Sequence, residues 1–159
     1  MSKVKSIQIS YIEYDSTKEL KSIHKTLLAN AKEMAEQAYA PYSNFPVGAA
    51  VLLDNGKEVG GSNQENRAFP SGLCAERVAL FSAGANFPKQ KILAIAIYAN
   101  TEEQISPCGS CRQVMLEYEE KQGKDIEVLL MNSKGEVRYF DKSSHLLPLG
   151  FKFDNFQSK

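Results

Sequence analysis

The sequence lacks an excess of charge of either sign. Its 159 residues hold 19 Lys and Arg against 19 Asp and Glu, so the formal net charge is zero. A protein that binds duplex DNA or an anionic membrane surface draws much of its affinity from phosphate groups and carries a cationic surplus for that purpose. The charge balance therefore argues against a nucleic acid or a membrane surface as the partner.

Long apolar runs are also missing. No segment approaches the ~18 consecutive apolar residues that cross a bilayer. The first ten residues, MSKVKSIQIS, contain two lysines, and no apolar core follows them. We therefore expect neither a membrane span nor a secretory signal peptide, and we expect the protein to be cytoplasmic.

Cysteine and histidine are scarce. The chain has three cysteines, an odd number that cannot close entirely into disulfides within one molecule. In a protein without an export signal the thiols are expected to be reduced, which makes metal binding or catalysis the more informative question. The two histidines are His24 and His145.

Repeats, low-complexity tracts and Pro/Ser-rich linkers are absent, and 159 residues is the length of one domain. We expect a single domain over residues 1–159, with residues 1–15 as an N-terminal extension. In this extension Ile7, Ile9 and Tyr11 alternate with polar residues, a pattern that predicts an extra strand.

The rest of the chain alternates between strand and helix patterns. A capping box at Ser16 and Glu19 predicts a helix that continues to about Tyr39. The Asn55-Gly56 pair predicts a tight hairpin turn. Further strands are predicted at 47–53, 57–63, 91–99, 126–131 and 137–140, and further helices at 74–85 and 108–121. This order predicts an α/β fold, a layered mixed β-sheet with helices on both faces.

The three cysteines lie at two predicted helix starts. Cys74 opens one helix, and Cys108 and Cys111 open the other with a three-residue step that places both on one face. A helix N-terminus favours the thiolate form that binds metal. One tetrahedral zinc ion could take all three thiolates and keep an open fourth position, which is the arrangement of a catalytic zinc site.

Charged residues adjoin these ligands. Glu76 follows Cys74 by two residues, where a carboxylate can take a proton from a water molecule activated by the metal and return it to the substrate. Arg77 and Arg112 lie in the first turns of the two helices. We expect both guanidinium groups to hydrogen-bond the sulfurs and so offset the negative charge of three thiolates.

Other chemistry fits part of this pattern. Cys108 and Cys111 alone could form a thioredoxin-like redox pair, although this interpretation leaves Cys74 and Glu76 unexplained. A structural zinc site would need a fourth ligand, and a Cys–His nucleophilic enzyme would need a motif around a histidine that the sequence does not show. A catalytic zinc site accounts for the most residues.

Taken together, these residues resemble the small homotetrameric cytidine deaminases, whose signature is His or Cys, any residue and Glu, followed later by Pro-Cys-x-x-Cys. The matching segments are AYAPYSNFPVGAAVL (38–52), SNQEN (62–66), LCAER (73–77), SPCGSCRQV (106–114) and LLPLGF (146–151). The resemblance implies a cytidine deaminase-like fold, zinc as the cofactor, and Glu76 as the proton shuttle. It also implies a homotetramer in which Phe151 completes a neighbouring subunit's site.

The resemblance further implies a pyrimidine nucleoside as the substrate, with cytidine and 2′-deoxycytidine hydrolysed to their uracil counterparts and ammonia in pyrimidine salvage. Asn63 and Glu65 would hold the sugar hydroxyls, and Phe45 would pack against the pyrimidine ring. The backbone groups of Ala75 and Pro107 would hydrogen-bond the edge of the base.

Two residues depart from the family pattern. Arg67 and Phe69 stand where the family commonly has a small residue and a tyrosine near the sugar. Phe69 has no hydroxyl, and Arg67 is a potential phosphate contact. The departure leaves open a nucleotide, or another cytosine-containing nucleoside such as an aminoacyl-nucleoside antibiotic, as the substrate.

Overall fold

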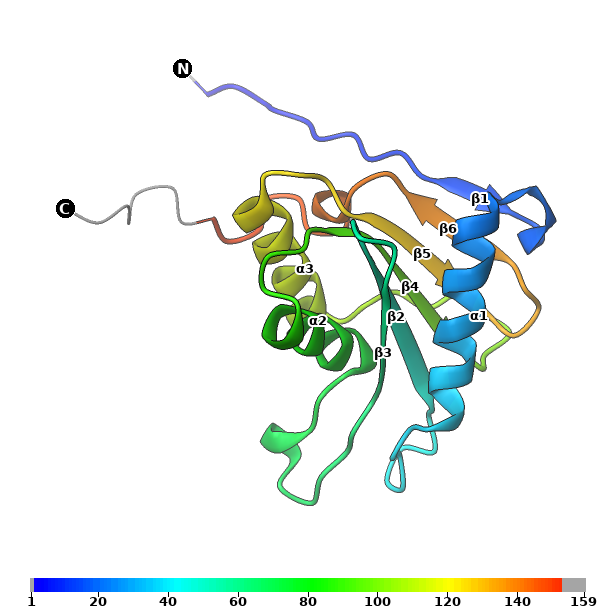
Figure 1. Cartoon of the computed structure of the whole chain (residues 1–159). Helices are drawn as coiled ribbons and strands as arrows, with labels where there is room; N and C mark the ends of the chain where they lie inside the picture. Colours follow the sequence, from blue (N-terminus) through cyan, green and yellow to red (C-terminus); the bar gives the residue numbers. More distant parts are fainter. Residues whose placement is uncertain (1, 153–159) are drawn as a thin grey trace.

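A computed structural model describes residues 2–152 of the chain, in which six strands form one sheet in the order β1-β6-β5-β4-β2-β3 (Figure 1). The strands are β1 (Ile12–Tyr14), β2 (Val47–Leu53), β3 (Glu58–Ser62), β4 (Ile92–Ala99), β5 (Glu127–Met131) and β6 (Val137–Phe140). β4 and β5 are parallel, and the other neighbouring strands are antiparallel. The predicted mixed sheet is therefore confirmed.

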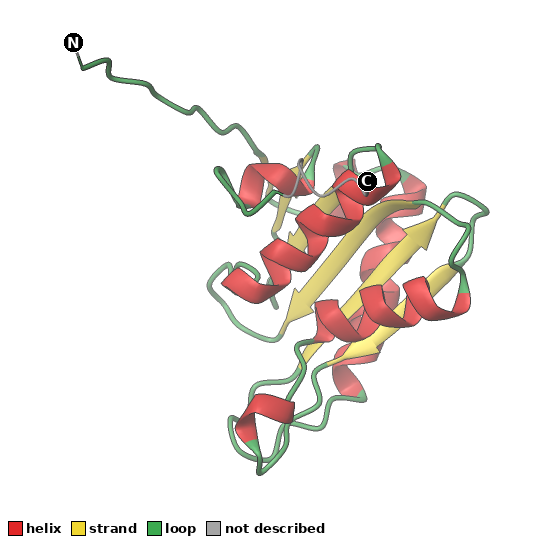
Figure 2. Ribbon diagram, turned by 90° about the vertical axis from the view of Figure 1, so that its left-hand side faces the viewer, coloured by secondary structure: helices red, strands yellow, loops and turns green. Residues whose placement is uncertain are grey.

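Helices cover both faces of the sheet (Figures 1 and 2). α1 (Ser22–Glu36) lies on one face, and α2 (Ala75–Asn86) and α3 (Gly109–Gln122) lie on the other. The central strands β2 and β4 send alternate side chains into two apolar clusters, one under α1 and one under α2 and α3. Burial on both faces explains why the sequences of β2 and β4 are almost continuously apolar.

A glycine in β3 sets how closely α2 approaches the sheet. A Cβ atom added at Gly61 would lie 2.5 Å from the Ala79 nitrogen and 2.8 Å from the Ala75 oxygen, both in the backbone of α2. Only glycine allows this approach without displacing the helix. Gly61 therefore determines where the first turn of α2, which carries Glu76, lies over the sheet.

The N-terminal region differs from the prediction. Residues 7–11 form no strand in the described structure, and β1 begins only at Ile12. Ser16 caps a short 3-10 helix (Thr17–Glu19), and the chain then becomes extended at Leu20, whose side chain is buried in the cluster under α1. Burial of Leu20 interrupts what the capping pattern predicted as one continuous helix.

The end of α1 also comes earlier than predicted. The helix ends at Glu36, and the Tyr39 amide donates to the Asn63 carbonyl oxygen at 3.0 Å instead of continuing the helical ladder. The remaining predicted elements lie within one or two residues of the observed ones. Gly56 turns the β2–β3 hairpin with φ of 82°. Among residues 2–152, no helix is long and apolar enough to span a bilayer.

Candidate active site

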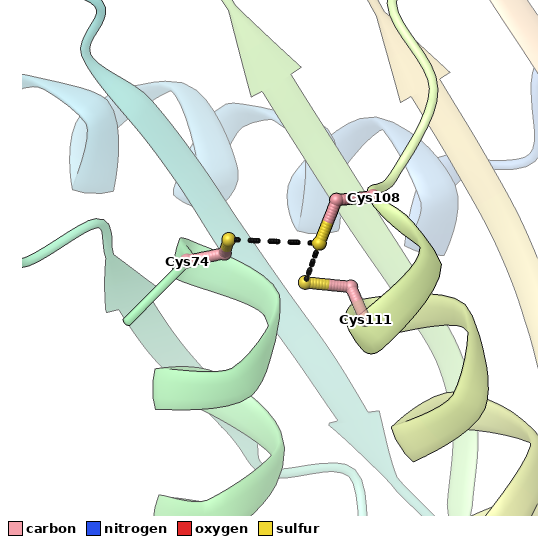
Figure 3. A group of neighbouring side chains, drawn as sticks. All are labelled: Cys74, Cys108 and Cys111. Carbon is pink, nitrogen blue, oxygen red and sulfur yellow. Dashed lines mark hydrogen bonds between the residues drawn. The ribbon is translucent and has the colours of Figure 1, made fainter. Parts of the chain in front are cut away.

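The three cysteines meet at the N-termini of α2 and α3 (Figure 3). Cys74 and Cys108 are the N-cap residues of the two helices, and Cys111 lies in the first turn of α3. The Cys74 and Cys108 sulfurs are 3.9 Å apart, and the Cys108 and Cys111 sulfurs are 3.4 Å apart. The sulfurs all lie within 4.8 Å of one another, as the sequence predicted for ligands of one ion.

This geometry fits zinc. Zn–S bonds of about 2.3 Å in a tetrahedral site place the sulfurs roughly 3.8 Å apart, close to the separations in the cluster. Thiolate sulfur is also a donor that zinc prefers. Among the described residues the metal-binding group consists of Cys74, Cys108 and Cys111 alone, with no fourth His, Cys, Asp or Glu. Three protein ligands characterise catalytic zinc sites, whereas structural sites use four.

The guanidinium of Arg77 stabilises negative charge on the neighbouring thiols. A hydrogen bond from the Cys111 thiol, together with Arg77 Nη2 at 3.7 Å, lowers the pKa of the Cys74 thiol to about 5, although partial burial opposes this shift. The same hydrogen bond and burial raise the pKa of Cys111. A thiolate is therefore favoured at Cys74 even before a metal binds, and Arg77 lies beside the sulfur, where the sequence predicted it.

Arg112 lies elsewhere than expected. Its Nε donates to the Pro107 carbonyl oxygen at 2.7 Å, and its Nη1 donates to the Leu146 carbonyl oxygen at 3.0 Å. The 3-10 helix Ser143–Leu146 packs against α3 and brings the Leu146 carbonyl to this side chain. Arg112 therefore joins the loop before Cys108 to the C-terminal segment rather than hydrogen-bonding a sulfur.

Glu76 is buried, with 4% of its surface exposed, in the first turn of α2. Burial raises the pKa of its carboxyl group, and the negative charge at Cys74 acts in the same direction. The residue nevertheless lines a cavity of about 620 Å³ together with Cys74 and Cys108. A carboxyl group in this position is shielded enough from water to hold a proton, and it is close enough to the cavity to transfer that proton to a bound substrate.

The same cavity brings together most of the predicted substrate contacts. Its wall includes the predicted residues Phe45, Asn63, Glu65 and Ala75. Pro107 and Phe151 are not among its lining residues. The backbone of Phe151 is instead held by Gln113, whose side-chain amide donates to the Phe151 oxygen at 2.9 Å and accepts from the Phe151 nitrogen at 3.1 Å. The Phe151 side chain is exposed.

Asn63 and Glu65 hold the loop that carries Phe45. Asn63 Oδ1 accepts from the Val47 amide at 2.9 Å, and its Nδ2 donates to the Phe45 oxygen at 3.0 Å. Glu65 Oε2 accepts from the Tyr42 amide at 2.8 Å. Hydrogen bonds from the Ser43 side chain and the Tyr42 amide lower the pKa of Glu65, which keeps its carboxylate ionised at neutral pH.

Tyr42 and Ser106, which were not singled out from the sequence, also line the cavity, and so does Phe69, which the sequence marked as a departure from the family pattern. Tyr42 and Phe69 face each other edge to face, with ring centroids 6.0 Å apart, and Ser106 lies directly before Pro107. Tyr42 and Ser106 belong to the two matching segments AYAPYSNFPVGAAVL and SPCGSCRQV, so their position in those segments was the available signal. Arg67 is not a lining residue.

Residues 21–123 match the model of the cytidine and deoxycytidylate deaminase zinc-binding region. The chain belongs to this family. It is 44% identical over 111 residues to a cytidine deaminase of Sporosarcina psychrophila, covering 70% of this chain and 79% of the relative. It is 41% identical over 125 residues to a cytidine deaminase of Halalkalibacterium halodurans, covering 79% and 91% of the two chains.

Solved structures agree with this assignment. The crystal structure of cytidine deaminase from Burkholderia pseudomallei superposes with a TM-score of 0.72 at 45% identity, over 80% of this chain and 98% of that one. The crystal structure of cytidine deaminase from Mycobacterium tuberculosis superposes with a TM-score of 0.63 at 34% identity, over 82% and 98% of the two chains. The family match and the cysteine cluster together identify a zinc-binding hydrolytic deaminase domain.

Proposed function

We propose that this protein hydrolyses cytidine and 2′-deoxycytidine to uridine and 2′-deoxyuridine, with release of ammonia, in pyrimidine salvage. The observation that carries the proposal is the cavity wall, where buried Glu76 adjoins two sulfurs of the Cys74–Cys108–Cys111 cluster. The cytidine deaminases at 41% and 44% identity support the choice of substrate.

In this mechanism Cys74, Cys108 and Cys111 hold zinc, which supplies the Lewis acidity that makes water acidic enough to react at neutral pH. Glu76 accepts a proton from the attacking water and delivers it to N3 of the pyrimidine, so that C4 becomes a better electrophile. Glu76 then helps to move a second proton to the departing 4-amino group. One water molecule is consumed, the C4–N4 bond breaks, and the amine leaves as ammonia.

The cavity wall suits a pyrimidine nucleoside. Phe45 would pack against the base, and the ionised Glu65 would accept a hydrogen bond from a sugar hydroxyl. Asn63 Nδ2 carries a second hydrogen for the sugar beyond the one donated to Phe45. The Ala75 backbone in the cavity wall would hydrogen-bond the edge of the base. Pro107 lies outside the wall, and its carbonyl, which already accepts from Arg112, would need to reach the base through its second lone pair.

The charge of the cavity favours a free nucleoside over a nucleotide. None of the described residues that line the cavity is a lysine or an arginine. Phosphate recognition usually recruits such a side chain or a glycine-rich loop. Because Arg67 does not line the cavity, the phosphate contact that the sequence left open has no support from this geometry.

We also propose a homotetramer working in the cytoplasm. Phe151 is exposed on a segment that Gln113 holds in place, which suits a side chain that reaches a neighbouring subunit's site. The chemistry of the site supports a reducing compartment, because Cys74, Cys108 and Cys111 bind zinc only as thiolates and not as a disulfide.

The test is incubation of the purified chain with cytidine and 2′-deoxycytidine, with CMP and dCMP as controls, while ammonia and ultraviolet absorbance are followed. We expect one ammonia per nucleoside, little reaction with the nucleotides, loss of activity with a zinc chelator and recovery on addition of zinc. Absence of ammonia from both nucleosides in a chain that contains zinc would refute the proposal. A metal-free Cys108–Cys111 disulfide would favour the redox interpretation.

A further inference from the structure

Residues 2–11 precede the region that matches the family model and form an extended arm, which Figures 1 and 2 both show projecting from the body. Ile7, Ile9 and Tyr11 alternate with polar residues, and their surfaces are 57%, 37% and 49% exposed. In the described structure these residues have a strand-forming pattern but pair with no strand. An exposed extended segment presents unpaired backbone N–H and C=O groups, and together with alternating apolar side chains these form a template for pairing with another chain.

The arm continues directly into a free sheet edge. β1 pairs with β6 on one side and ends the described sheet on the other. The side-chain alternation carries through this junction, because Tyr11 packs on Phe140, with ring centroids 5.2 Å apart, while Tyr14 packs against the cluster under α1. The odd-numbered arm residues therefore share a face with Glu13. Asp15, in the bend that follows β1, lines the same hollow as Glu13.

Opposite charges lie at the two ends of this segment. Lys3 and Lys5 are the charged residues before Glu13, and both are exposed. At the other end, Glu13 and Asp15 line a hollow of about 450 Å³. Its wall contains five carboxylates and one basic residue, namely Glu13, Asp15, Glu102, Glu103, Glu136 and Arg138. Arg138 already pairs with Glu13 at 2.7 Å, but the five carboxylates still outnumber this one basic residue, so the hollow is complementary to a lysine-bearing strand.

We propose that residues 2–15 pair antiparallel with the same residues of a second copy of this chain, around a two-fold axis at Ile9. Ile9 then lies opposite the partner subunit's Ile9, and Ile7 lies opposite the partner's Tyr11. Lys5 faces the partner's Glu13, and Lys3 faces the partner's Asp15. Each arm thereby extends the free β1 edge of the other copy, and each hollow receives lysines.

The charges and apolar residues select this register. Shifting the pairing by two residues in one direction places Lys5 opposite the partner's Tyr11, and in the other direction places Ile7 opposite the partner's Glu13. Either shift loses one kind of charge pair and one kind of apolar pair. The shifted registers are therefore less stable, because each favourable cross-strand pair contributes about 0.2–1 kcal/mol. Isologous pairing forms each of these pairs twice, except that of Ile9 with the partner's Ile9, which lies on the two-fold axis and forms once. The proposal is independent of the proposed function.

Disulfide trapping tests the register on the full chain. We expect Ile9→Cys to form a disulfide-linked dimer under mild oxidation, because the two sulfurs lie directly across the axis. Ile7→Cys is the matched control, since residue 7 and its partner's equivalent would lie ~14 Å apart along the strands. The unsubstituted chain, with its three native thiols, sets the background. Equal trapping of both variants, or none above background for Ile9→Cys, would overturn the proposal.

Reversing the charges of Lys3 and Asp15 in the Ile9→Cys variant tests the proposed ion pair at each end of the paired segment. We expect Lys3→Glu and Asp15→Lys to slow trapping about tenfold each by placing like charges opposite one another, and the double variant to regain the original rate. An arm that folds back on its own chain, or that binds a different protein, would give no such rescue. Slow trapping by the double variant, or unchanged trapping by both single variants, counts against the pairing.

Discussion

Two glutamates on the same face of the sheet are equally buried and differ completely in their surroundings. Glu119, near the end of α3, has 7% of its surface exposed, and Glu76, at the start of α2, has 4%. Glu119 Oε2 accepts from the Ile126 amide, the Ser143 amide and the Ser143 hydroxyl at 3.0, 2.8 and 2.9 Å. Its Oε1 accepts from the Ser144 amide at 3.2 Å.

Glu76 has no comparable set of donors in the described structure. No backbone amide of another described residue donates to its carboxyl group, and burial raises the pKa of this group above the usual range. A carboxylate that accepts several backbone hydrogen bonds anchors structure, whereas one that is buried with few donors remains available for proton transfer. Burial alone therefore does not distinguish the two roles, and the number of donors does.

The largest expected effect is that of Glu76→Gln. We expect kcat for cytidine to fall by about 10²- to 10⁴-fold, because the amide cannot accept and return a proton. Zinc content, measured by atomic absorption, should stay at the wild-type level, and the Tm should not fall. A variant that retained the wild-type kcat would refute the assignment of Glu76 as the proton shuttle.

The converse substitution is Glu119→Gln. We expect the free energy of unfolding to fall by about 1–3 kcal/mol, because the amide NH₂ would face backbone donors that then lack an acceptor. The kcat of the folded protein should remain within about threefold of the wild type. Glu117→Gln, on the exposed side of α3, is the control and should change neither quantity. Denaturant titration and steady-state kinetics on the same samples separate the two effects.

The two arginines in the first turns of α2 and α3 allow a second comparison, between a side chain that contacts a sulfur and one that does not. We expect Arg77→Gln to weaken zinc affinity by about 10- to 100-fold, because Arg77 donates toward the Cys74 sulfur. Arg112→Gln should leave zinc affinity unchanged and lower the Tm, since its donors hold the Pro107 and Leu146 carbonyls. Competition with a chromogenic chelator measures the affinity. Equal weakening by both variants would contradict the separation of roles.

The smallest expected effect lies under α1. Partial burial alone would raise the pKa of Glu127, but hydrogen bonds from Tyr139 at 2.7 Å and with His24 at 2.8 Å lower it overall. A lowered folded-state pKa stabilises the fold above the unfolded value of about 4.3, and this gain is lost as the pH falls through the folded pKa.

We therefore expect Glu127→Gln to lower the free energy of unfolding by about 1 kcal/mol near pH 7. The difference from the wild type should begin to shrink below the unfolded pKa of about 4.3 and should vanish once the pH has fallen below the lowered folded pKa. Denaturant titrations between pH 3 and 7 measure it. A difference that stayed constant across this range would show that the carboxylate charge contributes nothing.

Much of the site could be predicted from local sequence. Cys74 and Cys108 lie within one residue of their helix starts, because capping and periodicity depend on neighbours only a few positions away. The three-residue step between Cys108 and Cys111 likewise sets their common face without any distant contact. Phe45, Asn63 and Glu65 were found through the family segments and line the cavity.

Other features depended on contacts between segments far apart in the chain. The direction of Arg112 depends on where Leu146 lies, 34 positions later. The anchoring of Glu119 depends on Ser143 and Ser144, and no local pattern marks it. Residues 7–11 carry a strand pattern without a strand, because alternation specifies which side chains could face a partner and cannot supply one.

The sequence by itself thus determined the residue types, the helix starts and the ligand spacing, all of which follow from short-range backbone and side-chain preferences. Tertiary structure alone decided which buried charges acquired donors and which stayed free to react. A hydrogen bond requires a donor and an acceptor about 3 Å apart. Whether a buried polar group finds a partner therefore depends on which distant segment folding brings beside it.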